Sequence, residues 1–253
     1  MNCRSPVLEF LQQAKLELAQ YLDCTGLLIY SNVDTLRSNA VIYWGFNPGQ
    51  DPDVQHETNW KIQDALDYFP TQSESLIDVQ RWPNTNGGIV VYENGTRRYK
   101  VEYKTGMAPY QRGVRHLLET IQHPDALVTN YIFVQSRCME SLAETDELVA
   151  RCWRVHELIF QITQPQVLIT TAGVVASMRR HRLVSLVLEE VCPVPSGYAN
   201  WRCKVWKGQR FVVIETPHMS YWGNSIHTKG EEAVRWVSEK IRERLQVPRP
   251  QAR

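Results

Sequence analysis

The chain lacks the patterns that identify several large classes of protein. Its six cysteines include no Cys-x-x-Cys pair, which argues against a zinc knuckle and a disulfide framework. No apolar stretch approaches the ~18 uncharged residues of a membrane span, and the N-terminus has no signal-peptide core. Neither sign of charge dominates, because 28 Lys and Arg stand against 27 Asp and Glu. We therefore expect a cytoplasmic protein with reduced thiols, in which any anion-binding face is local.

The chain does contain alternating helical and strand patterns. Such alternation predicts an α/β fold, a single domain with a central, mostly parallel β-sheet flanked by helices. We expect this domain to span residues 1–247, with a loose tail at 248–253. The patterns predict helices over 6–22, 61–69, 110–121, 142–162, from a turn at Gly173 through 178, and 229–245; they predict strands over 40–44, 126–134 and 167–171, and a hairpin over 205–214 that turns at 207–209.

Residues 70–105 interrupt this alternation with a polar and aromatic segment. Within it, 89–92 and 97–103 are joined by Glu93-Asn94-Gly95-Thr96, and Asn-Gly supplies the positive φ angles of a tight turn. We interpret the segment as a β-hairpin insertion on the core domain. The insertion either contributes to substrate binding, or it only packs on the surface or contacts phosphates, and the pattern leaves these readings open.

Three polar side chains fall where expected strands end. Asn47 follows the apolar run 41–44, Asn130 lies in the expected strand 126–134, and His218 follows the run that begins at Phe211. Ligands of parallel α/β sheets bind beyond the carboxyl ends of the strands. The sequence therefore predicts a site at that edge, although Asn-Pro-Gly is also an ordinary turn sequence.

Several of these segments together resemble the uracil-DNA glycosylase superfamily, in particular its mismatch-specific and single-strand-selective branches. Gly45-Phe46-Asn47-Pro48-Gly49 is similar to the Gly-x-Asn-Pro-Gly first motif. Thr129-Asn130-Tyr131-Ile132-Phe133 resembles the strand whose Asn reads the base. Residues 152–177 are similar to the helix, strand, glycine and helix passage. Pro217-His218-Met219-Ser220 resembles the His-Pro-Ser motif, with Met in place of Pro.

The resemblance implies hydrolysis of the N-glycosidic bond of a flipped-out nucleotide. Asn47 would orient the water, and His218 would donate to the base oxygen as negative charge develops there. Backbone amides of Phe46 and Ser220 would assist, and Asn130 would bind the hydrogen-bonding edge of the base. An aromatic ring would stack on that base; the candidates are Phe69, Tyr68 and Trp60.

A second alignment register is also possible, because Gly49-Gln50-Asp51-Pro52 reproduces the start of the classical uracil enzymes, whose Asp activates the water. We prefer the Asn47 register, in which Gly45 directly follows the strand. Asp51 remains a candidate catalytic residue, supported by Asp53 or Glu57, or else a solvated loop acid. In the preferred register Gly49 replaces the Tyr that excludes substituents at C5 of the pyrimidine, so the resemblance favours 5-substituted bases.

Contacts to DNA are expected from local features. Tyr221, Trp222 and Asn224 follow the His-x-Ser element, where the family inserts a wedge into the base stack. Trp222 is the first candidate, and its alternative is a core ring. Arg179 in Arg179-Arg180-His181-Arg182 is a candidate phosphate contact, with a solvated face as the alternative.

The sequence thus predicts a monofunctional DNA glycosylase that acts on a modified pyrimidine, such as glucosylated hydroxymethylcytosine of phage DNA, in antiviral defence. Its expected partner is DNA, without membrane, metal or cofactor. The alternatives are a uracil or mismatch repair glycosylase, a non-catalytic DNA-binding relative, and an unrelated α/β hydrolase or nucleotide-binding protein. No Gly-x-Ser-x-Gly, P-loop or dinucleotide motif supports the last of these.

Overall fold

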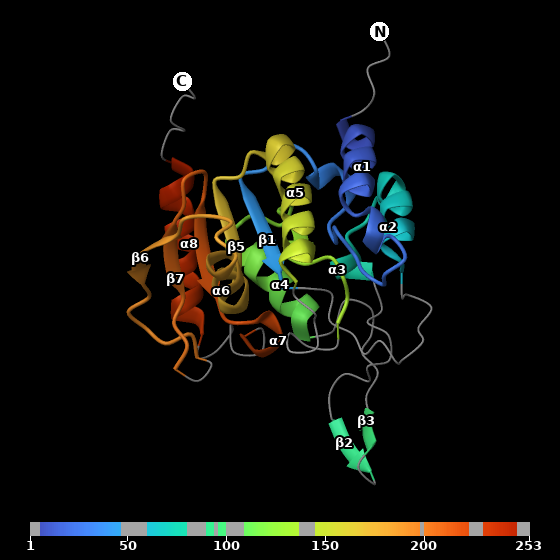
Figure 1. Cartoon of the computed structure of the whole chain (residues 1–253). Coiled ribbons are helices and arrows are strands. Elements are labelled where there is room, and N and C mark those ends of the chain that lie inside the picture. Colours follow the sequence, from blue (N-terminus) through green and yellow to red (C-terminus); the bar gives the residue numbers. More distant parts are fainter. Residues whose placement is uncertain are drawn as a thin grey trace.

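The protein is built on one six-stranded sheet, seen in the computed structural model in Figure 1. The structure describes residues 6–46, 60–79, 90–93, 96–99, 109–136, 145–197, 200–222 and 230–246. The strand order is β4-β1-β5-β8-β7-β6. The first four of these strands run parallel, whereas β7 is antiparallel to β8 and β6 is antiparallel to β7. The predicted α/β class and mostly parallel sheet are therefore confirmed.

The second strand in this order is β1, Val41–Gly45, in which all five residues are buried. A continuous run of branched and aromatic side chains suits a parallel strand that is covered on both faces. β1 pairs with β4, Leu127–Asn130, on one side and with β5, Val167–Thr171, on the other. β8, Val212–Thr216, follows β5, and the antiparallel strands β7, Lys204–Lys207, and β6, Val187–Val191, complete the sheet.

Helices cover both faces of the sheet. One face packs against α1, α5 and α6, and the other against α3, α4, α7 and α8. The bounds are α1 Pro6–Glu17, α2 Ile62–Tyr68, α3 Leu76–Val79, α4 Pro109–Thr120, α5 Asp146–Thr163, α6 Ala172–Arg180, α7 Met219–Trp222 and α8 Glu231–Gln246, with short 3-10 turns at Ala19–Tyr21, Val33–Thr35 and Phe69–Thr71.

Most of the expected elements are confirmed, with shifted ends. The long helix α5 begins after Thr145, whose side chain accepts a hydrogen bond from the Leu148 amide, and it ends at Gln164 in a left-handed conformation. The expected turn at Gly173 is wrong, because Gly173 lies inside α6. The expected strand 126–134 stops at Asn130. The patterns did not predict β6, α3 or α7.

The hairpin in the expected insertion is confirmed. β2, Val90–Glu93, pairs antiparallel with β3, Thr96–Tyr99, and Glu93 faces Thr96 across the turn. The two strands form a sheet of their own. In Figure 1 this hairpin lies apart from the main sheet, below the edge at which β1 ends.

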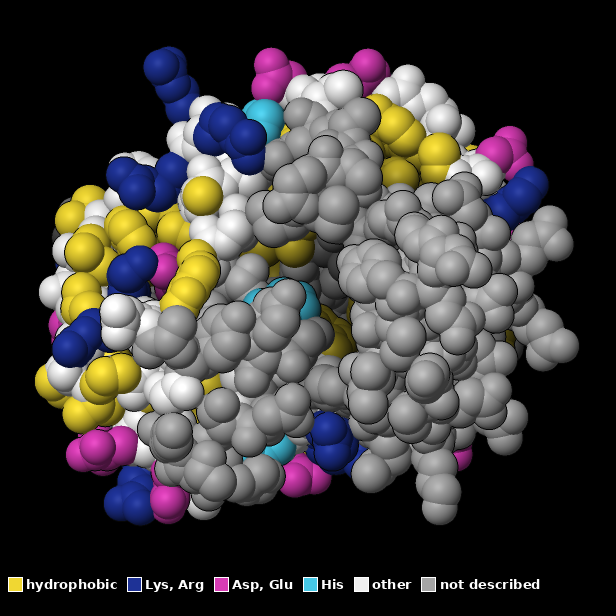
Figure 2. Space-filling view, turned by 90° about the horizontal axis from the view of Figure 1, so that it is seen from below, with side chains coloured by type: hydrophobic (Ala, Val, Ile, Leu, Met, Phe, Trp, Pro, Cys, Tyr) yellow, Lys and Arg dark blue, Asp and Glu magenta, His cyan; other side chains and the backbone are white. Residues whose placement is uncertain are grey.

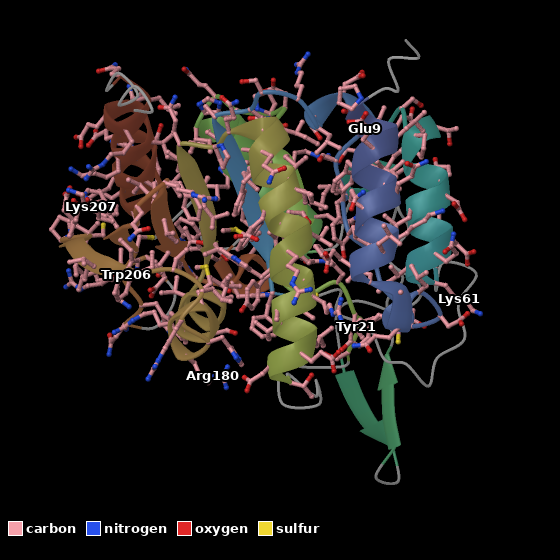
Figure 3. The ribbon with its side chains drawn as sticks, turned by 45° about the horizontal axis from the view of Figure 1, so that its top comes forward. Glu9, Tyr21, Lys61, Arg180, Trp206 and Lys207 are labelled. Carbon is pink, nitrogen blue, oxygen red and sulfur yellow. The ribbon has the colours of Figure 1, made fainter. Side chains whose placement is uncertain are left out.

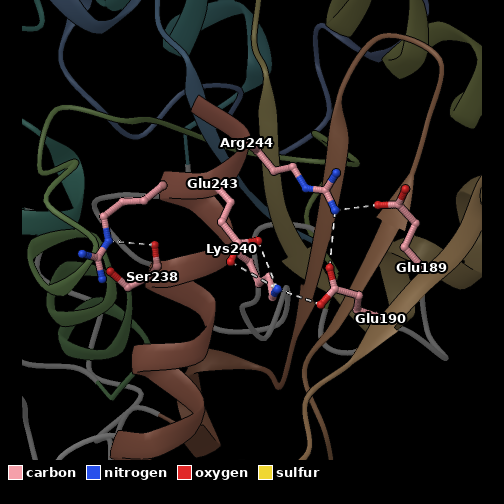
Figure 4. A network of polar contacts seen from close by, with 7 residues as sticks. Glu189, Glu190, Ser238, Lys240, Glu243 and Arg244 are labelled. Atoms are coloured by element: carbon pink, nitrogen blue, oxygen red, sulfur yellow. Dashed lines mark hydrogen bonds and ion pairs between the residues drawn. The ribbon is translucent and has the colours of Figure 1, made fainter. Parts of the chain in front are cut away.

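Ion pairs attach the edge strand β6 to the C-terminal helix, as Figure 4 shows. Lys240 of α8 lies 2.8 Å from the Glu190 carboxylate, and Arg244 lies 2.8 Å from that of Glu189. The hydrogen bond from Lys240 to Glu190 raises the pKa of the lysine. β6 exposes Val187, Leu188 and Val191, so apolar burial contributes little to its attachment. Its paired glutamates also explain why an apolar pattern did not reveal it.

A histidine is buried in the aromatic core between the sheet and α5. His156 is fully buried. Its Nε2 lies 3.0 Å from the Tyr131 carbonyl oxygen, and its ring centroid lies 4.1 Å from that of Trp44. Burial lowers its pKa to about 3, and the hydrogen bond to the Tyr131 carbonyl opposes that shift only in part. His156 is therefore a neutral structural side chain at neutral pH.

This burial predicts acid sensitivity. The folded pKa of His156 lies below the value of about 6.5 in an unfolded chain, so the unfolded state binds a proton first as the pH falls. The free energy of unfolding should lose about 1.4 kcal/mol per pH unit from this residue between about pH 6 and pH 4. Denaturant titrations of the wild type and His156→Leu should give the shallower pH dependence for the variant. Equal slopes would contradict this account.

Candidate functional site

The carboxyl edge of the sheet brings Gly45 and Asn130 side by side. Gly45, the last residue of β1, pairs in register with Asn130, the last residue of β4. Asn130 is only 2 % exposed. Threonine hydroxyls connect neighbouring strands at this edge: Thr170 Oγ1 donates to the Trp44 carbonyl oxygen at 3.0 Å, and Thr216 Oγ1 to that of Thr170 at 3.2 Å. The strand ends that carry the predicted site are thus held at fixed positions.

Gly45 is required at this position because two polar side chains lie against its backbone. A Cβ atom on Gly45 would lie 2.3 Å from Asn130 Oδ1 and 2.6 Å from the Tyr110 hydroxyl oxygen. Both distances are shorter than a side chain tolerates. Gly45 was predicted as a substrate-binding residue of the Gly-x-Asn-Pro-Gly motif; in the structure its missing side chain lets Asn130 and Tyr110 converge.

Sequence reasoning did not identify three tyrosines of this cluster: Tyr30 and Tyr110 lie near Asn130, and Tyr43 packs against Tyr110. The Asn130 Nδ2 donates to the Tyr30 hydroxyl at 3.0 Å. The rings of Tyr43 and Tyr110 pack edge to face, with their centroids 6.4 Å apart. Only Tyr43 carried a sequence signal, because it lies two residues before Gly45 and so on the same face of β1. Tyr30 is 100 residues from Asn130 in sequence, and no local pattern links them.

His218 lies beside this cluster at the end of β8. Its ring centroid is 5.6 Å from that of Tyr110, with an interplanar angle of 34°. Its carbonyl oxygen accepts from the Trp222 amide, which places His218 directly before α7. The residue keeps solvent-exposed surface, yet the protein around the imidazole displaces enough water to lower its pKa. At neutral pH the imidazole is neutral and can donate through one ring nitrogen.

The cluster is polar but uncharged. Burial raises the pKa of Tyr30, Tyr43 and Tyr110, so all three hydroxyls stay protonated. The nearest deeply buried carboxylate along β8 is Glu215, which is engaged by Lys204 at 2.6 Å and by Trp206 Nε1 at 2.9 Å. Within the described residues, the arrangement is therefore suited to bind a neutral polar group and to donate hydrogen bonds to developing negative charge.

Several predicted site residues lie outside the described part of the chain. These are Asn47, Gly49, Asp51 and Asn224. Ser220 and Tyr221 lie in α7, and their side chains are also outside it. The predicted roles of all six stay predictions. The structure brings together Gly45, Asn130 and His218 from three separate segments of the chain.

Two aromatic predictions are corrected. Trp222 was expected to enter the DNA stack, but it is 0 % exposed and its Nε1 donates to the Ser196 carbonyl oxygen at 2.8 Å. A ring with no exposed surface cannot contact a base without leaving the core. Phe69 was expected to stack on the flipped base, yet it packs among Phe10, Leu11 and Leu66 beneath α1. Of the other stacking candidates, Tyr68 is exposed and packs against Trp60 with ring centroids 4.8 Å apart.

Phe46 is likewise a core side chain, 5 % exposed, with its ring centroid 6.0 Å from that of Tyr131. Its carbonyl oxygen accepts from the Ile132 amide at 2.8 Å. This bond extends the contact between the β1 and β4 segments beyond the two strands. The predicted role of its backbone amide stays a prediction.

Basic side chains gather beside this edge at the end of α6. Figure 2 views the carboxyl edge and shows Lys and Arg side chains at its upper left, where α6 ends. Arg179 and Arg180 form the last turn of that helix, and Figure 3 shows Arg180 at its lower end. The Arg179 guanidinium lies 5.2 Å from the centre of the Trp206 ring on β7. Arg179 is thereby oriented by a cation–π contact, and its predicted contact to phosphate stays a prediction.

A separate open cleft of about 800 Å³ lies beside α4. It is lined by residues near the start of β4 and in the second half of α4, including Arg115, Glu119 and Asp125. This position is toward the amino ends of the parallel strands. None of the predicted site residues lines the cleft, so this cleft and the polar cluster are different places.

The comparisons with known proteins add no family. The sequence matches no protein-family model, and no curated protein matches it. Within the described residues, no helix is both long and apolar enough to cross a membrane. That part of the chain also holds no group of three or more His, Cys, Asp or Glu side chains placed to bind a metal. The resemblance to uracil-DNA glycosylases remains a prediction from motifs.

The close approach at Gly45 predicts a strong effect of one methyl group. Gly45→Ala should lower the free energy of unfolding by about 1–3 kcal/mol, because Asn130 and Tyr110 must both move. Urea denaturation measures this change. The matched control is Gly208→Ala, whose Cβ would lie 2.8 Å from the Phe211 carbonyl oxygen at the opposite edge of the sheet. Only Gly45→Ala should shift the NMR signal of the Asn130 side-chain amide, and an unshifted signal would show that the crowding is absent.

Proposed function

We propose that the protein is a monofunctional DNA glycosylase that removes a flipped-out, 5-substituted pyrimidine from DNA and leaves an abasic site. Glucosylated hydroxymethylcytosine of phage DNA is the substrate we favour, which would make the activity a defence against phage. The observation that carries the proposal is the in-register pairing of Gly45 with Asn130 at the carboxyl edge. It sets the start of the Gly-x-Asn-Pro-Gly segment beside the Asn that we expect to read the base.

The electrostatics of the cluster support this chemistry. Breaking an N-glycosidic bond develops positive charge on the sugar and negative charge on the departing base. A neutral His218, whose pKa burial lowers, can donate to the base oxygen without bringing a net charge to the site. Asn130 is 2 % exposed and therefore desolvated. A base that left the hydrogen-bonding groups of Asn130 unpaired would bind poorly and be rejected.

The reaction follows from these roles. A water held by Asn47 attacks C1′ of the sugar as the bond from C1′ to the base nitrogen breaks. The base departs with the bonding electron pair, and negative charge collects on its oxygen, toward which His218 donates. The water supplies the hydroxyl on C1′ and, through solvent, the proton on the released base. In the same proposal, Asp51 is a further candidate catalytic residue, and Gly49 leaves room for a substituent at C5 of the base.

Base release from defined duplexes tests the proposal. The wild type should produce alkali-labile abasic sites in at least one duplex with a 5-substituted pyrimidine, and mass spectrometry should identify the liberated base. Asn47→Ala and His218→Ala should each slow release by about 100-fold or more, because each removes a group that acts on the transition state. Binding to the same duplex should persist.

The matched control is His123→Ala, because His123 lies in the turn after α4 and outside the cluster; it should release base at the wild-type rate. Release from a uracil duplex alone would favour the repair alternative. Release from none of the duplexes, or full activity in either Asn47→Ala or His218→Ala, would show that the proposed reaction or mechanism is wrong.

A further inference from the structure

We propose that Trp201 is a DNA-binding residue whose ring stacks on a base beside the flipped-out nucleotide, the role that sequence reasoning gave to Trp222. This inference rests on the proposed glycosylase function. Trp201 is 46 % exposed, whereas Trp222 is 0 % exposed. The position of Trp201 at the carboxyl edge, its fixed backbone and the basic side chains near it support this role.

The pairing of β7 with β8 places Trp201 at the same edge of the sheet as His218. Lys204, the first residue of β7, pairs antiparallel with Glu215, the last residue but one of β8. Trp201 comes three residues before Lys204, and His218 comes three residues after Glu215. Because one antiparallel strand begins where its neighbour ends, Trp201 and His218 both lie beyond the carboxyl end of β8.

The backbone of Trp201 is connected by hydrogen bonds to the segment that carries His218. The Trp201 carbonyl oxygen accepts from the Ser196 amide at 2.8 Å, and the Ser196 carbonyl oxygen accepts from Trp222 Nε1 at 2.8 Å. The Trp222 amide in turn donates to the His218 carbonyl oxygen at 3.0 Å. Ser196 is fully buried. Trp222 is therefore a core residue that fixes Trp201 relative to His218, which lowers the entropic cost of binding through the Trp201 ring.

The next residue along the chain, Arg202, holds this segment from the other side. Its guanidinium donates to the carbonyl oxygen of Cys192 at 2.9 Å and to that of Pro193. The Cys192 amide donates to the Cys203 carbonyl oxygen at 2.8 Å. These contacts extend the pairing of β6 and β7 beyond the ends of both strands. The indole of Trp201 is thus exposed although the backbone on both sides of it is held.

Basic and apolar side chains lie together at this part of the carboxyl edge. Figure 2 shows them interleaved along the left side of the molecule, where Figure 1 places β6 and β7. Arg179 is exposed at the end of α6, with its guanidinium 5.2 Å from the centre of the Trp206 ring. Exposed rings beside cations suit DNA with a nucleotide flipped out, because the neighbouring base has lost a stacking partner and the phosphates attract the cations.

A second copy of this chain fits the surface less well than DNA does. The edge strand β6 also exposes Val187, Leu188 and Val191. Its register with β7 shifts between Leu188 and Glu190, and such a bulge disfavours pairing of one edge strand with another. Two copies that met at this edge would also bring basic side chains such as Arg179 together, whereas DNA neutralises them. We therefore infer DNA as the partner.

Binding to a duplex that contains a stable abasic-site analogue tests the role of Trp201. Trp201→Ala should weaken binding by about tenfold or more, because it removes one stacked base. The dependence of affinity on salt should stay unchanged, because no phosphate contact is lost. Trp201→Phe should retain most of the affinity. Leu16→Ala is the matched control, since it removes another exposed apolar side chain, on α1; it should bind as the wild type does.

A 2-aminopurine base next to the abasic-site analogue reports the contact directly, because stacking on an aromatic ring quenches its fluorescence. The wild type should quench it, and Trp201→Ala should not. Equal quenching by the two proteins would overturn the stacking role, whatever their affinities. Self-association of the free wild type that Trp201→Ala abolishes, with equal quenching, would assign the ring to a second copy instead.

The same experiment separates this inference from the proposed reaction. If the wild type binds and quenches through Trp201 but releases no base, the glycosylase proposal fails and the DNA contact stands. If the wild type releases base while Trp201→Ala quenches equally, the glycosylase proposal stands and the inference on Trp201 fails. A wild type that binds no DNA would overturn both.

Discussion

The candidate site depends on how closely Asn130 and Tyr110 approach the backbone of Gly45. Two polar atoms can occupy that space only because position 45 has no Cβ. The approach in turn requires that β1 and β4 pair so that Gly45 faces Asn130. Helix α4 contributes Tyr110, and Tyr110 packs against His218, which follows β8. One missing side chain thus lets four segments of the chain meet.

A buried polar cluster is stable only when its groups are paired and uncharged. Burial keeps the three tyrosines protonated, and the bond from Asn130 to Tyr30 satisfies the carboxamide on one side. Threonines at the ends of β5 and β8 hold the neighbouring strands. Such a site is organised before a ligand arrives, which lowers the entropic cost of binding and of orientation. Charged side chains instead form ion pairs away from the site, such as those that attach β6 to α8.

Much of the fold could be predicted from the sequence because strands and helices with continuous burial carry a strong apolar signal. β5 has the predicted bounds, and β1 begins within one residue of them. β6 was not predicted because it contains glutamates, which pair with basic side chains of α8. At the site, Gly45, Asn130 and His218 were found from the ends of apolar runs. Tyr30 and Tyr110 were not, since their contacts join distant segments. Trp222 was misinterpreted because its position after a motif does not reveal which face of α7 is buried.

We propose that a ligand binds at the polar cluster of Gly45 and Asn130 and not in the open cleft beside α4. The most direct measurement is an NMR titration of the ¹⁵N-labelled protein with a short duplex that contains a stable abasic-site analogue. We expect the largest chemical-shift changes at Gly45, Asn130 and His218, with the side-chain amide of Asn130 among them. Changes centred on Arg115, Glu119 and Asp125, with the cluster unaffected, would contradict it.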